Sequence, residues 1–186
     1  MDRITYFENP GTENTEAVLR LVKKRAGELG IKTIVIASTR GETAVQAMEI
    51  LGGFKVIFVS HTAGFREADS QEFSREAHQA VEAKGATVLT TTHAFGGLSR
   101  AVRNKYDTPG LGDIVAGTLR IFGEGMKVVC EIALMAADSG LVSTAEDIIS
   151  VAGTGHGADT AVVLRPVNTH RFFDLKVREI ICKPRF

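Results

Sequence analysis

The chain has 186 residues, the size of one domain, and the sequence predicts a single domain over residues 1–186. Hydrophobic residues make up 44% and charged residues 24%, which suits a globular protein with a buried core and excludes a disordered chain. Basic and acidic residues number 22 each, so the basic surface that nucleic acid requires is not expected. A chain without net charge also lacks mutual repulsion, which favours a homo-oligomer.

The sequence indicates a cytoplasmic protein without a membrane partner. The first twenty residues mix acidic and basic side chains, unlike a signal peptide, and no apolar run approaches the length of a membrane span. Cys130 and Cys182 lack the CxxC spacing of zinc and redox sites, so both are interpreted as reduced packing residues.

The first half of the chain predicts alternating strands and helices. Apolar residues at helical spacing predict a helix over 14–29, ended by Gly30. Residues 32–38 and 54–60 are apolar without alternation, as in parallel strands covered on both faces. The stretch between them has the spacing of a helix, which completes a βαβ unit.

A second unit follows, with a helix over 69–84 that begins at Asp69 or Ser70 and a strand over 86–92. Residues 93–111 lack a clean period and are predicted to form a long loop, with one helical turn at most. Residues 112–138 predict helix that Gly123 and Gly125 kink or divide.

The last part of the chain predicts three strands, at 147–153, 160–166 and 175–183. Only a glycine-rich turn separates the first two, so they should form an antiparallel hairpin, and the third should lie near the sheet edge. The predicted fold is therefore a three-layer α/β fold: a mostly parallel central sheet, helices on both faces, and a C-terminal antiparallel hairpin.

Small and hydroxyl-bearing residues follow each of the four strands predicted to be parallel. The carboxyl ends of parallel strands meet at one edge of a sheet, where helix N-termini direct free N–H groups at a ligand. The exits should form one pocket rich in donors and poor in acids, which favours phosphate. The candidate binding residues are Ser38, Thr39, Arg40, Gly41, Thr43, His61, Thr62, Thr91, Thr92, His93, Phe95, Gly153, Thr154 and Gly155.

The stretch after the first buried strand has two interpretations. Gly41 would let the backbone approach phosphate oxygens, which the hydroxyls of Ser38 and Thr43 would also contact. Alternatively, Thr39 and Glu42 have the spacing of a capping box, which satisfies backbone donors without any ligand. The two interpretations can coexist, because a capping Glu42 would be held back from the anion.

The glycine-rich stretch at 153–160 contains a GxGxG sequence but does not predict a dinucleotide fold. The dinucleotide fingerprint opens a helix, whereas this stretch leads into a strand. Its glycines fit a loop that wraps a ligand and fit equally well a hairpin turn that needs none.

Three histidines lie in the predicted rim loops: His61, His93 and His156. None has HxH or HExxH spacing, so no metal is expected and a hydrogen bond to a phosphate or substrate oxygen is favoured. Phe95 and Tyr106 could stack on a planar ring or pack their loop onto the sheet. Neither a GxSxG nucleophile elbow nor a Walker sequence occurs, so no catalytic residue is assigned.

The order of elements and the sequence "ASTRGETA" resemble the C-terminal α/β domain of pyruvate kinase over most of the chain. In pyruvate kinases the corresponding segment cradles an effector phosphate, and Ser38, Gly41, Thr43 and Ala44 match its pattern. The catalytic barrel would need several hundred further residues, so kinase activity is not inferred. The stretches "GTGHGADTAVVL" and "HAFGG" are similar to those of a group of stand-alone proteins with which flavin mononucleotide (FMN) is associated.

The resemblance and the pocket together predict a protein that binds a phosphorylated small molecule or nucleotide, with FMN favoured. If the chain is an enzyme, an FMN-dependent oxidoreductase is the first expectation, since the cofactor would supply the redox chemistry. The alternatives are a regulatory or sensor module that binds a sugar phosphate or another nucleotide, and a hydrolase that uses the rim histidines.

Overall fold

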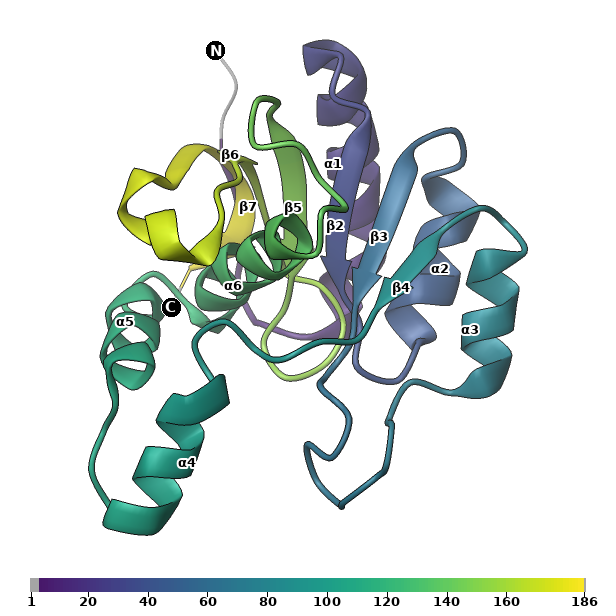
Figure 1. Ribbon diagram of the computed structural model, residues 1–186. Helices are drawn as coiled ribbons and strands as arrows, with labels where there is room; N and C mark the ends of the chain where they lie inside the picture. Colours follow the sequence, from purple (N-terminus) through teal and green to yellow (C-terminus); the bar gives the residue numbers. More distant parts are fainter. Residues whose placement is uncertain (1–3, 186) are drawn as a thin grey trace.

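The computed structural model describes residues 4–185 and contains one seven-stranded sheet (Figure 1). The strand order is β1-β7-β6-β5-β2-β3-β4. β5, β2, β3 and β4 are parallel neighbours, whereas β6 is antiparallel to both β5 and β7. The strands are β1 (Thr5–Phe7), β2 (Thr33–Ala37), β3 (Lys55–Val59), β4 (Thr87–Leu89), β5 (Ile148–Ala152), β6 (Thr160–Arg165) and β7 (Lys176–Pro184).

Helices cover both faces of this sheet, which confirms the three-layer α/β prediction. Side chains of α1, α2 and α3 pack in the core on one face, and those of α5 and α6 pack on the other. The α-helices are α1 (Thr15–Leu29), α2 (Glu42–Ile50), α3 (Arg75–Glu82), α4 (Gly97–Tyr106), α5 (Leu111–Arg120) and α6 (Glu124–Asp138), with short 3-10 helices η1 (Thr12–Asn14) and η2 (Thr169–Asp174).

Burial on both faces explains why the central strands have no alternation of apolar and polar residues. In β2, Ile34 and Ile36 pack under α1 and α2, while Val35 packs against α6, and all three are fully buried. The same pattern runs through β3 and β5. Continuous apolar runs are what a strand between two helical layers requires.

The predicted start of the helix over 69–84 was wrong. The helix predicted over 69–84 begins only at Arg75, because the Ser74 hydroxyl caps it by accepting the N–H of Ala77 at 3.1 Å. Asp69 has a φ of 59°, which does not continue a right-handed helix. Residues 69–74 therefore belong to the loop after β3.

The segment at 93–111, predicted as a long loop, contains the ten-residue helix α4. None of the residues of α4 is buried in the core. A helix without a buried face has no apolar period that the core imposes, so the pattern was not recognisable. Residues 111–138 divide at Gly123, whose φ of 117° separates α5 from α6, whereas Gly125 lies inside α6.

Strand β1 was not predicted at all, since three residues are too few to show a pattern. It pairs in parallel with β7 and forms one edge of the sheet. β7 was predicted to lie near the edge, and it is the second strand from that edge. The predicted hairpin is confirmed, because β5 and β6 pair antiparallel from Ile148–Leu164 to Ala152–Thr160.

Candidate functional site

The loops after β2, β3, β4 and β5 lie together at the lower edge of the sheet in Figure 1 and enclose a cavity of about 340 Å³. We call this cavity the strand-end pocket. The candidate residues that line it are Ser38, Thr39, Arg40, Thr43, His61, His93, Gly153 and Gly155, and His156 joins them. The strand exits thus converge on one cavity, as parallel topology requires.

The pocket is not as poor in acids as the sequence indicated. The first half of α6 forms one wall and brings carboxylates with it, which reasoning from the strand exits alone could not include. The charged residues that line the pocket are Arg40, Glu42, Arg100, Arg120, Glu124, Lys127 and Glu131. Two of the carboxylates are paired: Glu124 binds Arg120 at the end of α5 at 2.6 Å, and Glu131 binds Lys127 within α6.

The predicted capping box at the start of α2 does not form. The N-cap is Gly41, which has no side-chain oxygen, and Thr39 instead lies near His61. Gly41 has a φ of 109°, and a Cβ built on it would lie 2.3 Å from the Cβ of Ala77. Packing of α2 against α3 therefore requires the glycine, whether or not an anion approaches its backbone.

Other candidate residues do not line the strand-end pocket. The backbone N–H of Thr62 donates a hydrogen bond to Nε2 of His93 at 3.3 Å, so it already has a partner within the protein. Thr91, Thr92 and Phe95 line a neighbouring cavity of about 640 Å³ between α4, α5 and η2. Phe95 is only 6% exposed and packs edge-on against Phe172 with ring centroids 5.5 Å apart, which supports its packing role.

The loop after β5 is tied down by Asp159, which is fully buried. Its carboxylate accepts the backbone N–H of Thr154 at 3.0 Å and that of Gly11 at 3.3 Å. A Cβ on Gly153 would lie 2.4 Å from the carbonyl oxygen of Gly157. Close backbone packing thus accounts for Gly153. Among the described residues, the buried hydroxyl of Thr154 has no hydrogen-bond partner.

His61 is held by a carboxylate that sequence analysis placed in a helix. Its Nδ1 lies 2.7 Å from Oε2 of Glu72, and its Nε2 lies 3.5 Å from the hydroxyl oxygen of Thr39. Burial would raise the pKa of Glu72, but the hydrogen bond and charge of His61, with Arg66, hold that pKa below its ordinary value. Glu72 is therefore ionised at neutral pH.

His93 lies beside His61, with ring centroids 5.3 Å apart. Burial lowers the pKa of His93, and the charges of His61, Lys127 and Arg100 lower it further, against the opposing effect of Glu131. The ring is neutral at pH 7. Since Nε2 accepts the N–H of Thr62, the proton of the neutral ring resides on Nδ1.

Phe65 completes this part of the site. Its ring lies 4.0 Å from that of His61 and 5.2 Å from that of His93, and the guanidinium of Arg100 lies over it at 4.0 Å. The loop after β3 and helix α4 are thereby joined at the pocket. A cation over an aromatic face is a stabilising contact that also fixes the cation in place.

Sequence analysis missed Phe65, Glu72, Arg100, Lys127 and Glu131. Two of them carried a recognisable signal: Lys127 and Glu131 are the charged residues, spaced i and i+4, of the otherwise apolar run "MKVVCEIALMAA". Charges on a buried face need partners, so that pair could have been marked as functional. Glu72 and Arg100 lie in segments whose structure was predicted incorrectly, and Phe65 lies in the loop after β3.

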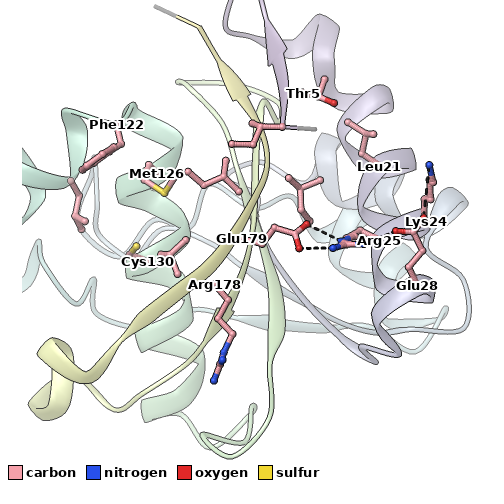
Figure 2. A pocket seen from close by; sticks show the side chains of 15 residues that line it. Thr5, Leu21, Lys24, Arg25, Glu28, Phe122, Met126, Cys130, Arg178 and Glu179 are labelled. Carbon is pink, nitrogen blue, oxygen red and sulfur yellow. Dashed lines mark hydrogen bonds and ion pairs between the residues drawn. The ribbon is translucent and has the colours of Figure 1, made fainter. Parts of the chain in front are cut away.

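A second and larger cavity, of about 990 Å³, flanks β7 (Figure 2). Figure 2 shows α1 on one side of β7 and Met126 and Cys130 of α6 on the other. Among its ionic groups, Arg25 binds Glu179 at 2.7 Å, and Arg178 binds Asp147 outside the cavity at 2.9 Å. Burial raises the pKa of Cys130 to about 12, so its thiol is unreactive at neutral pH. None of the candidate residues lines this cavity.

Within the described residues, no helix is long and apolar enough to cross a membrane. Likewise, no group of three or more histidine, cysteine or acidic residues in residues 4–185 could hold a metal ion.

Fold and pocket define an α/β protein with a polar crevice at the carboxyl ends of its parallel strands. Residues 16–164 match the family described as "Pyruvate kinase, alpha/beta domain", and the chain belongs to this family. It spans less than a quarter of the pyruvate kinases that it resembles in structure. The match to a Cryptosporidium parvum pyruvate kinase in complex with ADP covers 80% of this chain and 22% of that protein, at 13% sequence identity and a TM-score of 0.41. Another structure of a pyruvate kinase from Cryptosporidium parvum matches 82% with 23%, at 13% identity and a TM-score of 0.43.

Proposed function

We propose that the strand-end pocket binds the phosphate of a phosphorylated small molecule, and that FMN is this ligand. The observation that carries the proposal is the convergence of hydroxyls, cations and a helix N-terminus on one cavity. Ser38, Thr39 and Thr43 line it together with Arg100 and Lys127. Backbone N–H groups at a helix start, with hydroxyls and cations beside them, are the donors that phosphate prefers.

The start of α2 is the part of this site that suits a phosphate best. Because Gly41 is its N-cap, the first-turn N–H groups of α2 receive no oxygen from the cap side chain. Thr43, in that first turn, and Ser38, at the end of β2, are both nearly buried and line the same cavity. An anion here would also lie at the positive end of the helix dipole.

The flavin ring would extend toward the neighbouring cavity that Thr91, Thr92 and Phe95 line. The two cavities share His93 and Met135 in their linings, so the phosphate end and the apolar end adjoin. This neighbouring cavity is also lined by Phe172 and Phe173. Ligand cavities of a few hundred Å³ with apolar walls and a few polar groups are typical of cofactor sites. These residues therefore fit FMN.

If the chain is an FMN-dependent oxidoreductase, the flavin supplies the electron transfer, and this protein binds the phosphate, orients the ring and limits access of water. A regulatory module that binds a sugar phosphate or another nucleotide is the alternative. It is favoured by the resemblance to the pyruvate kinase domain, in which the segment equivalent to residues 37–44 cradles an effector phosphate.

Two measurements test the proposal. Purified chain should carry the visible absorbance of oxidised flavin, or acquire it when FMN is added and excess is removed. Riboflavin, which lacks the phosphate, is the matched control and should bind far more weakly. Equal binding of FMN and riboflavin would contradict the phosphate site. Binding of a sugar phosphate without FMN would favour the regulatory alternative.

A further inference from the structure

Two side chains that line the strand-end pocket, His61 and Thr39, form a line with the carboxylate of Glu72 behind them, from carboxylate to imidazole to hydroxyl. Oε2 of Glu72 lies 2.7 Å from Nδ1 of His61, and Nε2 of the same ring lies 3.5 Å from Oγ1 of Thr39. When the ring is in its neutral form, the carboxylate holds the ring proton on Nδ1. The lone pair of Nε2 therefore faces the Thr39 hydroxyl, which is the orientation that a general base needs.

The imidazole is held in this orientation by more than the carboxylate. The ring of Phe65 packs against it at 4.0 Å, and the amide of Gln71 donates to the backbone carbonyl of His61 at 3.2 Å. Arg66 binds the second oxygen of Glu72 at 2.9 Å. The Glu72 side chain is only 14% exposed and that of Arg66 is 64% exposed, so the contact with His61 is better shielded from water than the contact with Arg66.

Thr39 lies where an attacking hydroxyl could be used. It follows the buried strand β2 and precedes Gly41, the N-cap of α2. Negative charge that develops on a group bound at Thr39 would meet the N–H groups of the first turn of α2. A nucleophile, a base oriented by a third group, and donors for the developing charge are the three parts of covalent group transfer.

We propose that Thr39 is a nucleophile, His61 its general base and Glu72 the residue that orients the base. The substrate class is a phosphoryl ester that occupies the phosphate site in place of FMN. Attack forms the bond between Oγ1 and phosphorus and breaks the bond from phosphorus to the leaving oxygen. The hydroxyl proton passes to Nε2 of His61 and then to that oxygen. This step rests on the proposed phosphate site for its substrate, whereas the activated hydroxyl depends only on the three side chains.

A neutral organophosphorus electrophile tests the activated hydroxyl separately from the phosphate site. With di-isopropyl fluorophosphate, Thr39 would form the Oγ1–P bond, the P–F bond would break, fluoride would leave, and His61 would take the proton before passing it to solvent. Peptide mass spectrometry should find the adduct on Thr39. Thr39→Val should abolish it, and Thr39→Ser should accelerate labelling because a primary hydroxyl is less hindered.

The base and the orienting residue have distinct signatures. His61→Gln should slow labelling about 100-fold, the scale of general base catalysis. Glu72→Gln should slow labelling and shift the tautomer ratio of His61 in nitrogen NMR, and Glu72→Asp should restore part of both. His78→Gln is the matched control, since His78 also pairs with a glutamate, Glu82 at 3.1 Å, but lies on α3 outside the pocket.

Absence of an adduct on Thr39 in the folded wild-type chain would overturn this inference, as would equal labelling of wild type and His61→Gln. Folding of each variant is checked by circular dichroism. Binding of FMN is measured on the same samples. Labelling without FMN binding would contradict the proposed function and support the activated hydroxyl. FMN binding without labelling would support the proposed function and contradict the activated hydroxyl.

Discussion

Glu131 of α6 accepts the backbone N–H of Phe95 at 2.9 Å, which ties the core helix to the loop after β4. Its other carboxylate oxygen binds Lys127, and Glu131 is only 3% exposed. This carboxylate thus supports the wall of the strand-end pocket from within the second helical layer. A buried carboxylate needs such partners, because an unpaired charge in a protein interior is costly.

Lys127→Met should destabilise the fold by about 3 kcal/mol, because it leaves the Glu131 charge buried without its cation. Glu131→Gln should cost less, about 1 kcal/mol, since the amide retains the bond to Phe95 and the Lys127 amine can extend toward water. Urea denaturation of both variants measures the difference. Equal losses would show that the ion pair does not stabilise this wall.

Stability should fall on acidification in a window that His93 defines. Its folded pKa lies below the unfolded value of about 6.5, so the unfolded chain binds the proton more readily. The contribution of neutral His93 is complete above that value and is lost as pH falls toward the folded pKa. His93→Asn should reduce this pH dependence. An unchanged stability profile between pH 7 and 5 in the variant would refute the assignment.

Gly41→Ala should destabilise the chain by about 2 kcal/mol, since its φ is 109° and the new methyl would meet Ala77. Combining it with Ala77→Gly should recover part of the loss. Gly155→Ala is the matched comparison, because Gly155 also has a positive φ, of 78°, but open space at its Cβ position. It should cost only about 1 kcal/mol. Thermal unfolding would contradict the packing explanation if both single variants lost the same stability.

We propose that the chain self-associates through α4 and α5. Leu98 and Leu111 are 85% and 75% exposed, and Tyr106 and Ile114 are also exposed on these helices. Figure 1 shows α4 and α5 extending from the sheet at its lower left. Exposed apolar side chains gathered on one segment indicate an interaction surface. Light scattering should find an oligomer that Tyr106→Gln with Ile114→Gln weakens, since these two residues do not line the cavity proposed for the flavin ring; a monomer at all concentrations would contradict this.

The fold was predictable because its central strands are buried on both faces and its turns are marked by glycine. The continuous apolar runs around Ile36 and Phe58 are typical of interior strands, and both residues are fully buried. Gly30, with a φ of 68°, ends α1 at the predicted position. The errors lie where the core imposes no pattern. Helix α4 buries no residue, and β1 has only three.

The candidate site was predictable only where residues belong to strand exits. Ser38, Thr43 and His61 follow from topology alone, since parallel strands end at one edge. Glu72 could not be assigned, because its segment reads as helix and its contact with His61 depends on the path of a loop. Glu131 reaches the pocket from α6, and its i, i+4 spacing from Lys127 in an apolar run indicates a buried ion pair without indicating which cavity the pair lines.

NMR mapping of FMN on the labelled chain tests the central claim most directly. The amide resonances of residues 38–44 and 153–157 should shift on addition of FMN, and riboflavin at the same concentration should leave those of residues 38–44 unchanged. Shifts confined to the cavity that flanks β7, or no difference between FMN and riboflavin at the start of α2, would contradict a phosphate site at the strand ends.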